Sequence, residues 1–137
     1  MFYEVKVKVT RTMENGTEKE VNEHYILDGC TLFAEAEEKM SEFVAADNVE
    51  YDVFSIVRSK VIEIINEKKE DEPFYKATVT ETFVDESGKE KEQKYYMLVC
   101  AKDVREANVI MEQHLSQGLN DMTLDGIVKT KILDLLK

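Results

Sequence analysis

The strongest constraint on this chain is that its second half repeats the pattern of its first half. The stretch FYEVKVKVT that begins at Phe2 matches FYKATVTET that begins at Phe74. ENG at Glu14 matches ESG at Glu86 with the same difference in residue number between the two halves. From Tyr25 onward, the matching residues differ in number by one less. Ordered matches with a single slip predict a tandem duplication. We expect the slip to lie in the hairpin turn, where a gained or lost residue is tolerated.

Each half predicts the same elements in the order β-β-α-β. Apolar and polar residues alternate in the first segment of each half, as in a strand with one buried face. ENG and ESG supply residues that accept the positive φ of a tight turn. The expected strands cover residues 2–12, 20–28, 53–61, 74–84, 93–100 and 124–132.

One helix is expected in each half, after the second strand. Asp103 and Glu106 have capping-box spacing and Gly118 is a helix stop, while Thr31 is the candidate cap in the first half. Apolar residues at helical spacing predict a buried stripe on each helix. The stripes are Phe33, Ala36, Met40 and Phe43 in the first half, and Val104, Ala107, Met111 and Leu115 in the second.

The domain division follows from the repeat. Residues 1–65 form the first β-β-α-β repeat, residues 66–73 (NEKKEDEP) a charged, solvated linker, and residues 74–137 the second repeat. A unit of about 65 residues buries too little surface to be robust alone, so the two are expected to pack as one pseudo-symmetric body. The fold class is α+β, with an antiparallel-rich sheet and one helix per unit. The repeats either share a six-stranded sheet or stack two three-stranded sheets.

Charge is unevenly distributed along this chain of net charge −11. The expected strands carry nine bases and six acids, whereas the remaining residues carry nine bases and 23 acids. If Val5, Val7 and Val9 face the helix, the lysines between them face away, which predicts a basic outer sheet face. The candidate nucleic-acid or anion-binding residues are Lys6, Lys8, Arg58, Lys60, Lys129 and Lys131, with Tyr95 and Tyr96 as stacking rings.

Another interpretation of the same face is a plain solvated surface, where lysine is common on strands. Five apolar residues would share this outer face, which indicates cover by the other unit or by another chain. They are Ile26, Ile56, Met97, Val99 and Ile127.

No catalytic constellation is recognisable in the sequence. It contains no Gly-rich phosphate loop and no serine elbow. His24, His114, Cys30 and Cys100 do not have the spacing of a compact metal motif. We therefore expect a protein that is not an enzyme and has no cofactor or metal, with both cysteines as small buried side chains.

Location is predicted from two further patterns. No run of 18 apolar residues is present, so we expect no membrane-spanning helix. The first residues do not form a basic region followed by an apolar run, which argues against a signal peptide and favours the cytoplasm.

The segments FYEVKVKVTRTMENGTEKEVNEHYILD, IVRSK, FYKATVT and KTKILDLL resemble domain of unknown function family 4494 over nearly the whole chain. The TMENG turn and the ILD ending are the most characteristic pieces. That family is found in Bacteroides-type gut bacteria and their phages, and it has no established activity or functional residues to transfer. The resemblance implies a phage or prophage gene product that acts in the host cytoplasm.

Three functions remain open at this point. The first is a protein-interaction or self-assembly module, with a protein partner or a homo-oligomer. The second is binding of single-stranded nucleic acid through the basic strand face. The third is an acidic mimic of nucleic acid, or an inhibitor of a basic host factor.

Overall fold

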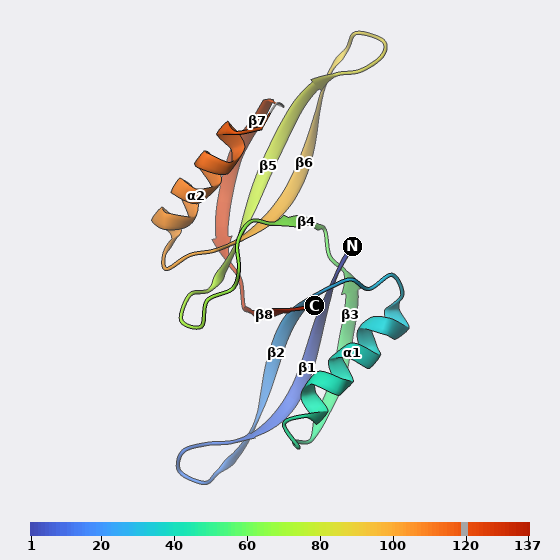
Figure 1. Cartoon of the computed structure of the whole chain (residues 1–137), viewed down its shortest axis with the longest axis vertical. Helices are drawn as coiled ribbons and strands as arrows, with labels where there is room; N and C mark the ends of the chain where they lie inside the picture. Colours follow the sequence, from blue (N-terminus) through green and yellow to red (C-terminus); the bar gives the residue numbers. More distant parts are fainter. Residues whose placement is uncertain (119–120) are drawn as a thin grey trace. The chain divides into compact units, whose positions relative to one another are not determined.

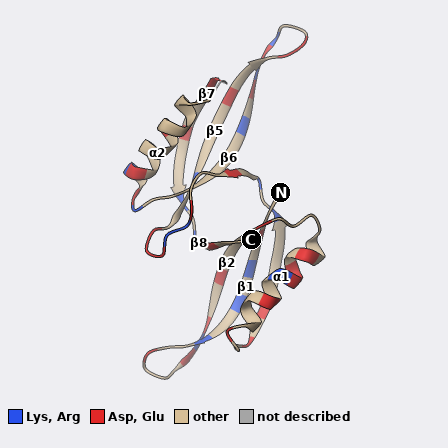
Figure 2. Ribbon diagram, in the orientation of Figure 1, with Lys and Arg blue, Asp and Glu red and all other residues tan. Residues whose placement is uncertain are grey.

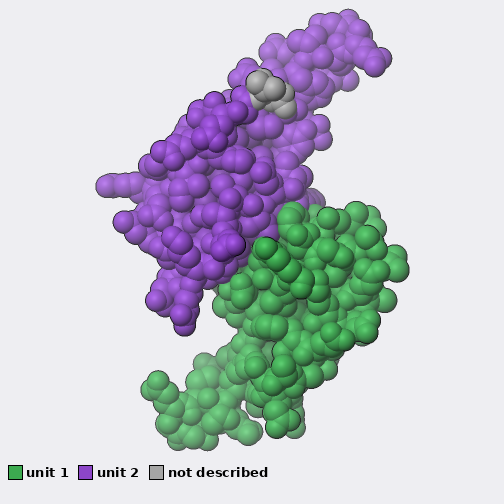
Figure 3. All heavy atoms as spheres, viewed as in Figure 1, with its two compact units in different colours: residues 1–59, 131–137 green, residues 60–130 purple. Residues whose placement is uncertain are grey.

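The computed structural model describes residues 1–118 and 121–137, which form two compact units (Figure 3). Unit 1 contains residues 1–59 together with residues 131–137, and unit 2 contains residues 60–130. The chain therefore leaves unit 1 after Ser59 and re-enters it at Lys131. The compact units do not divide the chain at residues 66–73, where the sequence repeat divides it.

Unit 1 is a four-stranded sheet with one helix (Figure 1). Its elements are β1 (Phe2–Thr12), β2 (Glu18–Asp28), α1 (Phe33–Ala45), β3 (Tyr51–Arg58) and β8 (Ile132–Leu136). The strand order is β3-β1-β2-β8, and all neighbours are antiparallel except β2 and β8, which are parallel.

Unit 2 has the same plan. Its elements are β4 (Val61–Ile64), β5 (Phe74–Val84), β6 (Glu90–Cys100), α2 (Val104–Ser116) and β7 (Asp121–Lys129). The order is β4-β6-β5-β7, with β4 parallel to β6. The predicted α+β class with two β-β-α-β repeats is confirmed. The six-stranded and three-stranded alternatives were both wrong, because each expected third strand breaks in two and its second part extends the other unit's sheet.

The helix side of each sheet forms the core, as the alternation predicted. Val5, Val7 and Val9 are fully buried with Met40 of α1, and Ala77, Val79 and Met111 form the corresponding core in unit 2. Burial of an aliphatic side chain stabilises the fold by about 2 kcal/mol. Packing of these short side chains therefore holds each helix against its sheet.

The helices lie where they were predicted, but the buried stripes are narrower than expected, because Phe33, Phe43 and Val104 are exposed while Ala36, Met40, Ala107 and Met111 are buried. The start of α1 also differs from its prediction. Asp103 caps α2, since its carboxylate accepts a hydrogen bond from the Glu106 backbone N–H at 2.8 Å. Thr31 was the expected cap of α1, but the N-cap residue is Leu32, and no side chain caps it. Thr31 instead donates its backbone N–H to the Glu35 carboxylate. The connection before α1 is one residue longer, which moves Thr31 out of the capping position.

The single slip in the repeat lies before the helix and not in the hairpin turn. The two hairpins have the same length. Phe2 pairs with Asp28 and Phe74 pairs with Cys100, and the difference in residue number between equivalent positions stays constant along both hairpins. The helices and the later strands are related by an offset that is one smaller. Tyr25 is therefore equivalent to Met97, not to Tyr96 as the letters suggested. The connection from β2 to α1 has one residue more than the connection from β6 to α2.

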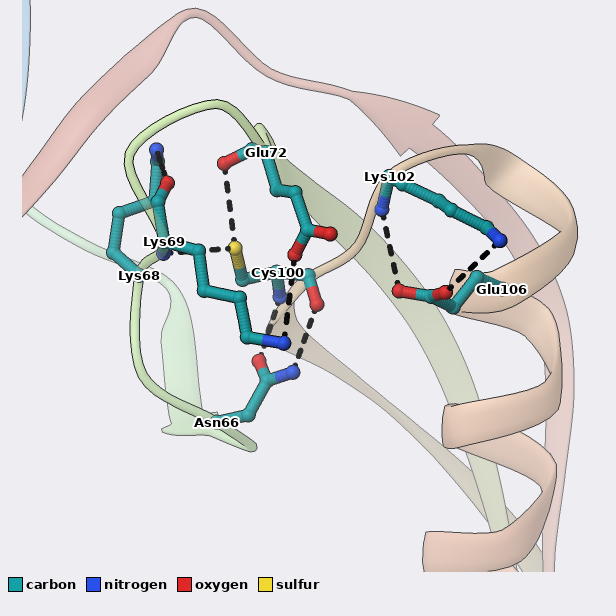
Figure 4. Close-up of polar contacts among 7 residues, drawn as sticks. All are labelled: Asn66, Lys68, Lys69, Glu72, Cys100, Lys102 and Glu106. Carbon is teal, nitrogen blue, oxygen red and sulfur yellow. Dashed lines mark hydrogen bonds and ion pairs between the residues drawn. The ribbon is translucent and has the colours of Figure 1, made fainter.

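Residues 66–73 are attached to unit 2 and are not a free linker. The Asn66 side chain makes two hydrogen bonds to the backbone of Cys100, accepting its N–H at 2.7 Å and donating to its carbonyl at 2.8 Å (Figure 4). The Cys100 thiol accepts the Lys69 N–H and donates to the Glu72 carbonyl.

Among the described residues, no helix is long and apolar enough to cross a membrane.

Candidate interaction surface on the β3 edge

The six predicted basic residues do not gather on one face. Lys6 and Lys8 are exposed on the face of β1 away from α1, as expected. Arg58 pairs with Tyr3, and Lys129 pairs with Tyr75. Directly paired residues in an antiparallel ladder point to the same face, so these two bases lie on the helix side. Arg58 donates from Nε to the Tyr3 hydroxyl at 3.4 Å.

Lys60 and Lys131 lie in the connections that follow β3 and β7, and they belong to different compact units. The predicted basic face is thus reduced to Lys6 and Lys8 on the strands. Lys8 lines a shallow hollow together with three carboxylates, those of Glu20, Glu50 and Asp52. These acids compensate its charge.

A bulge in each edge strand explains why the facing prediction failed. In β3 the pairing runs from Lys6 with Ser55 directly to Val7 with Val53, so Phe54 is the extra residue. In β7 the extra residue is Asp125. One inserted residue exchanges the two faces for all residues beyond it. Arg58 and Lys129 were therefore assigned to the wrong face.

The expected apolar residues of the outer face are also redistributed. Ile56, Met97, Val99 and Ile127 contribute to the helix-side cores. Ile26 remains on the side away from α1, where it is fully buried.

The expected stacking rings are partly engaged within unit 2. The Lys76 ammonium lies over the Tyr96 ring, 5.1 Å from its centroid. The Tyr95 hydroxyl donates to Glu81 at 3.4 Å. A cation over one ring face leaves less of that ring for base stacking.

Three large apolar residues of β3 are exposed. Tyr51, Phe54 and Val57 are 39%, 48% and 51% exposed. We call these three residues the β3 edge. Since β3 is last in the strand order, one of its sides has no strand partner among residues 1–118 and 121–137. Such an edge presents backbone N–H and C=O groups to another chain.

The equivalent strand of unit 2 is built differently at the bulge. Asp125 occupies the position of Phe54, and the Thr80 hydroxyl donates a hydrogen bond to its carboxylate. A charged residue on an edge strand discourages pairing with other chains. The two repeats therefore differ at the residue that protects or exposes the edge.

The surroundings of the β3 edge are strongly acidic. Residues 33–52 contain seven acids and one lysine, whereas the equivalent residues 104–123 contain three acids and one arginine. Figure 2 shows the acids along α1. All seven are exposed, namely Glu35, Glu37, Glu38, Glu42, Asp47, Glu50 and Asp52. The hollow lined by Lys8, Glu20, Glu50 and Asp52 also contains Tyr51 of the edge.

An ion-pair network fixes the loop that precedes β3. Arg11 makes two hydrogen bonds to Glu23, at 2.9 and 3.2 Å, and one to Asp47 at 2.9 Å. These carboxylates raise the pKa of the Arg11 guanidinium. Burial, and then the hydrogen bond to Glu23, raise the pKa of the Tyr25 hydroxyl. Because Asp47 lies just after α1, the network holds the helix end against the hairpin.

The residues considered for metal binding lie apart. His24 Nε2 is 3.0 Å from Glu4, and His114 Nε2 is 3.3 Å from Glu63. Cys30 and Cys100 are buried free thiols. Within the described part of the chain, no group of three or more His, Cys, Asp and Glu side chains could hold a metal ion.

Sequence reasoning missed the β3 edge because VFSIVR has the pattern of a regular alternating strand. An available signal was the mismatch between the repeats at the bulge, where phenylalanine in one copy corresponds to aspartate in the other.

A family model described as "Domain of unknown function (DUF4494)" matches residues 1–137. No curated protein and no solved structure matches the chain.

Proposed function

Because the chain belongs to the DUF4494 family, whose description carries no activity, we propose a function from its surface: it is a non-enzymatic protein-interaction module. The partner supplies a basic, extended segment that pairs with the β3 edge. The observation that carries this proposal is the exposed Phe54 at a bulge where the other repeat has Asp125.

Strand addition is the binding mode that suits this surface. An extended segment gains main-chain hydrogen bonds from an open edge, and alternate side chains supply specificity. The β3 edge offers apolar contacts at Tyr51, Phe54 and Val57. The bulge limits regular pairing beyond Phe54, which favours a short segment over an extended sheet.

Charge selects the chemistry of the partner. Residues 33–52 have a net charge of −6, and every acid among them is exposed. A lysine or arginine of the partner fits the hollow where Glu20, Glu50 and Asp52 approach Tyr51. Charge complementarity mainly increases the association rate and suppresses wrong partners. A basic partner is also what an acidic inhibitor of a basic host factor would bind.

Peptide display tests the proposal directly. Random peptides of about a dozen residues are selected on the full chain alone, and each enriched clone is then measured for binding to Phe54→Asp. We expect peptides that alternate Lys or Arg with apolar residues, and at least tenfold weaker binding of each to Phe54→Asp. Aspartate already occupies the equivalent bulge position in β7, so this variant is compatible with the local fold.

A matched control uses Val84→Asp, an equal change in charge at a 67% exposed residue of unit 2. It should bind the selected peptides as the wild type does. Selection of acidic peptides, or peptides that bind wild type and Phe54→Asp equally, would contradict the proposal.

Nucleic-acid binding is the alternative that the same variants test. Fluorescence anisotropy of labelled oligo(dT) at low salt, about 20 mM, should show no binding. Salt-sensitive oligonucleotide binding that is lost in Lys6→Glu/Lys8→Glu and kept in Phe54→Asp would support that alternative instead.

The setting is a further part of the proposal, and it rests on the family resemblance. We propose a phage or prophage accessory protein of the bacterial cytoplasm. Fractionation of producing bacteria should place the chain with cytoplasmic markers. Recovery in the periplasmic or membrane fraction would refute this location.

A further inference from the structure

Unit 1 is completed by a segment that is distant in sequence. Residues 1–59 supply three strands and the helix, and residues 131–137 supply the fourth strand, β8. The whole segment between them, residues 60–130, belongs to unit 2. Nothing in the covalent structure requires the fourth strand to come from the same molecule.

The strand partner of β8 belongs to unit 1. Strand β8 pairs in parallel with β2, from His24 opposite Ile132 to Leu27 opposite Leu136. Ile132 is 5% exposed, and Leu136 packs against the helix-side core. Charge is complementary as well, because residues 1–59 have a net charge of −7 and residues 131–137 of +1.

A short connection joins β8 to unit 2. Only Thr130 and Lys131 separate it from β7. Thr130 is anchored on the unit 2 side, where its backbone N–H and its hydroxyl both donate to the Phe74 carbonyl, at 2.9 and 2.8 Å. Detachment of β8 can therefore leave unit 2 intact. Short connections of this kind favour exchange of an element between copies.

We propose that two copies of the chain exchange residues 131–137, so that β8 of each copy completes unit 1 of the other. The exchanged and closed forms contain the same β2–β8 contacts, so their balance depends on concentration and on the connection. This self-association is independent of the β3 edge, because β3 and β8 lie at opposite ends of the strand order.

Concentration sets the expected extent of exchange. A tethered segment reaches its own site with an effective concentration on the order of 1 mM. Exchange should then involve roughly half of the chains at about 1 mM, and only about one in fifty at about 10 μM. Because each copy has a net charge of −11, salt at about 0.3 M is needed to screen repulsion.

The test is a cross-link that records which chain supplies β8. Asp28→Cys and Lys137→Cys are combined in the full chain; each position is one residue beyond the paired Leu27 and Leu136. The native thiols of Cys30 and Cys100 are buried and should not react. The protein is incubated at about 1 mM slightly below its unfolding midpoint, returned to native conditions so that the native thiols are buried again, treated with a short bismaleimide, and separated on a denaturing gel.

A closed chain is cross-linked internally and runs as a monomer, whereas an exchanged pair runs as a covalent dimer. We expect the dimer band to fall at least tenfold when the incubation is carried out at about 10 μM. Efficient cross-linking that yields only monomers after incubation at about 1 mM would overturn the proposal. Single-cysteine chains, each carrying one of the two replacements, give the collisional background at each concentration, and the dimer band of the double variant should exceed that background at the higher concentration.

The same gel separates this inference from the proposed function. Adding Phe54→Asp should leave the dimer band unchanged, because β8 does not contact the β3 edge in the sheet order. A dimer band that disappears with Phe54→Asp would show association through β3 and would refute strand exchange.

Discussion

Replacing Leu32 with aspartate should stabilise unit 1, because α1 lacks the cap that α2 has. Asp103 accepts the Glu106 N–H at 2.8 Å, whereas Leu32 at the equivalent position of α1 has no side-chain cap bond. Both N-cap residues have extended backbone conformations, with φ of −125° at Leu32 and −155° at Asp103. An aspartate at position 32 can therefore reach the first turn as it does in α2.

Four contributions determine the magnitude. A capping side chain contributes about 1 kcal/mol relative to an apolar residue. Its negative charge near the helix N-terminus adds about 0.5 kcal/mol. Leu32 is 60% exposed, so its removal sacrifices about 1 kcal/mol of apolar burial at most. Glu35 lies in the first turn and repels the new charge weakly. The net expectation for Leu32→Asp is a gain of about 0.5 to 1 kcal/mol.

Amide hydrogen exchange is the appropriate assay because it reports each helix separately. Leu32→Asp should slow exchange along α1 by about twofold to fivefold and leave α2 unchanged, as the free energy converts to a rate factor. Leu32→Asn provides the cap without the charge and should give a gain that is smaller by about 0.5 kcal/mol. Asp103→Ala should accelerate exchange in α2 by a similar factor. Unchanged α1 protection in both Leu32 variants would refute the capping argument.

Three further predictions follow from other sites. Gly88→Ala should lower the free energy of unfolding by about 1 kcal/mol in denaturant melts, because Gly88 has φ of +84°. Gly126 has no positive φ, so Gly126→Ala should lower the free energy of unfolding by less. Asn66→Ala should lower it by about 2 kcal/mol in the same melts, since the Cys100 backbone loses two partners; a loss no larger than that of an exposed Asn→Ala change would contradict this. The raised pKa of Tyr25 means that the unfolded chain loses its phenolic proton first, so stability is present below pH about 10 and falls as pH rises above it. Tyr25→Phe should weaken that decline in thermal melts between about pH 9 and 11, and an identical decline would argue against it.

Local patterns predicted most elements of this fold. The alternation of Val5, Val7 and Val9, the glycine turns and the capping box around Asp103 each depend on residues close in sequence. Such signals arise from backbone sterics and side-chain periodicity, and they are complete within a short window. The duplicated pattern then made each half support the interpretation of the other.

The candidate site was much less accessible to the sequence. A bulge adds one residue without changing the alternation in a recognisable way, and it exchanges the faces of the residues beyond it. Arg58 and Lys129 were therefore expected on a surface to which they do not belong. Phe54 became visible as an exposed edge residue only after its pairing was known.

The sequence by itself determined the doubled β-β-α-β order, the two hairpins and the helix-facing stripes, because these depend on nearby residues. Only the tertiary structure decided where β4 and β8 pair, where the repeat slips by one residue and which side of β3 each residue takes. Those features depend on hydrogen bonds between segments far apart in the chain. Pairing of β8 with β2 joins residues near opposite ends of the chain, and no local pattern encodes the choice of partner.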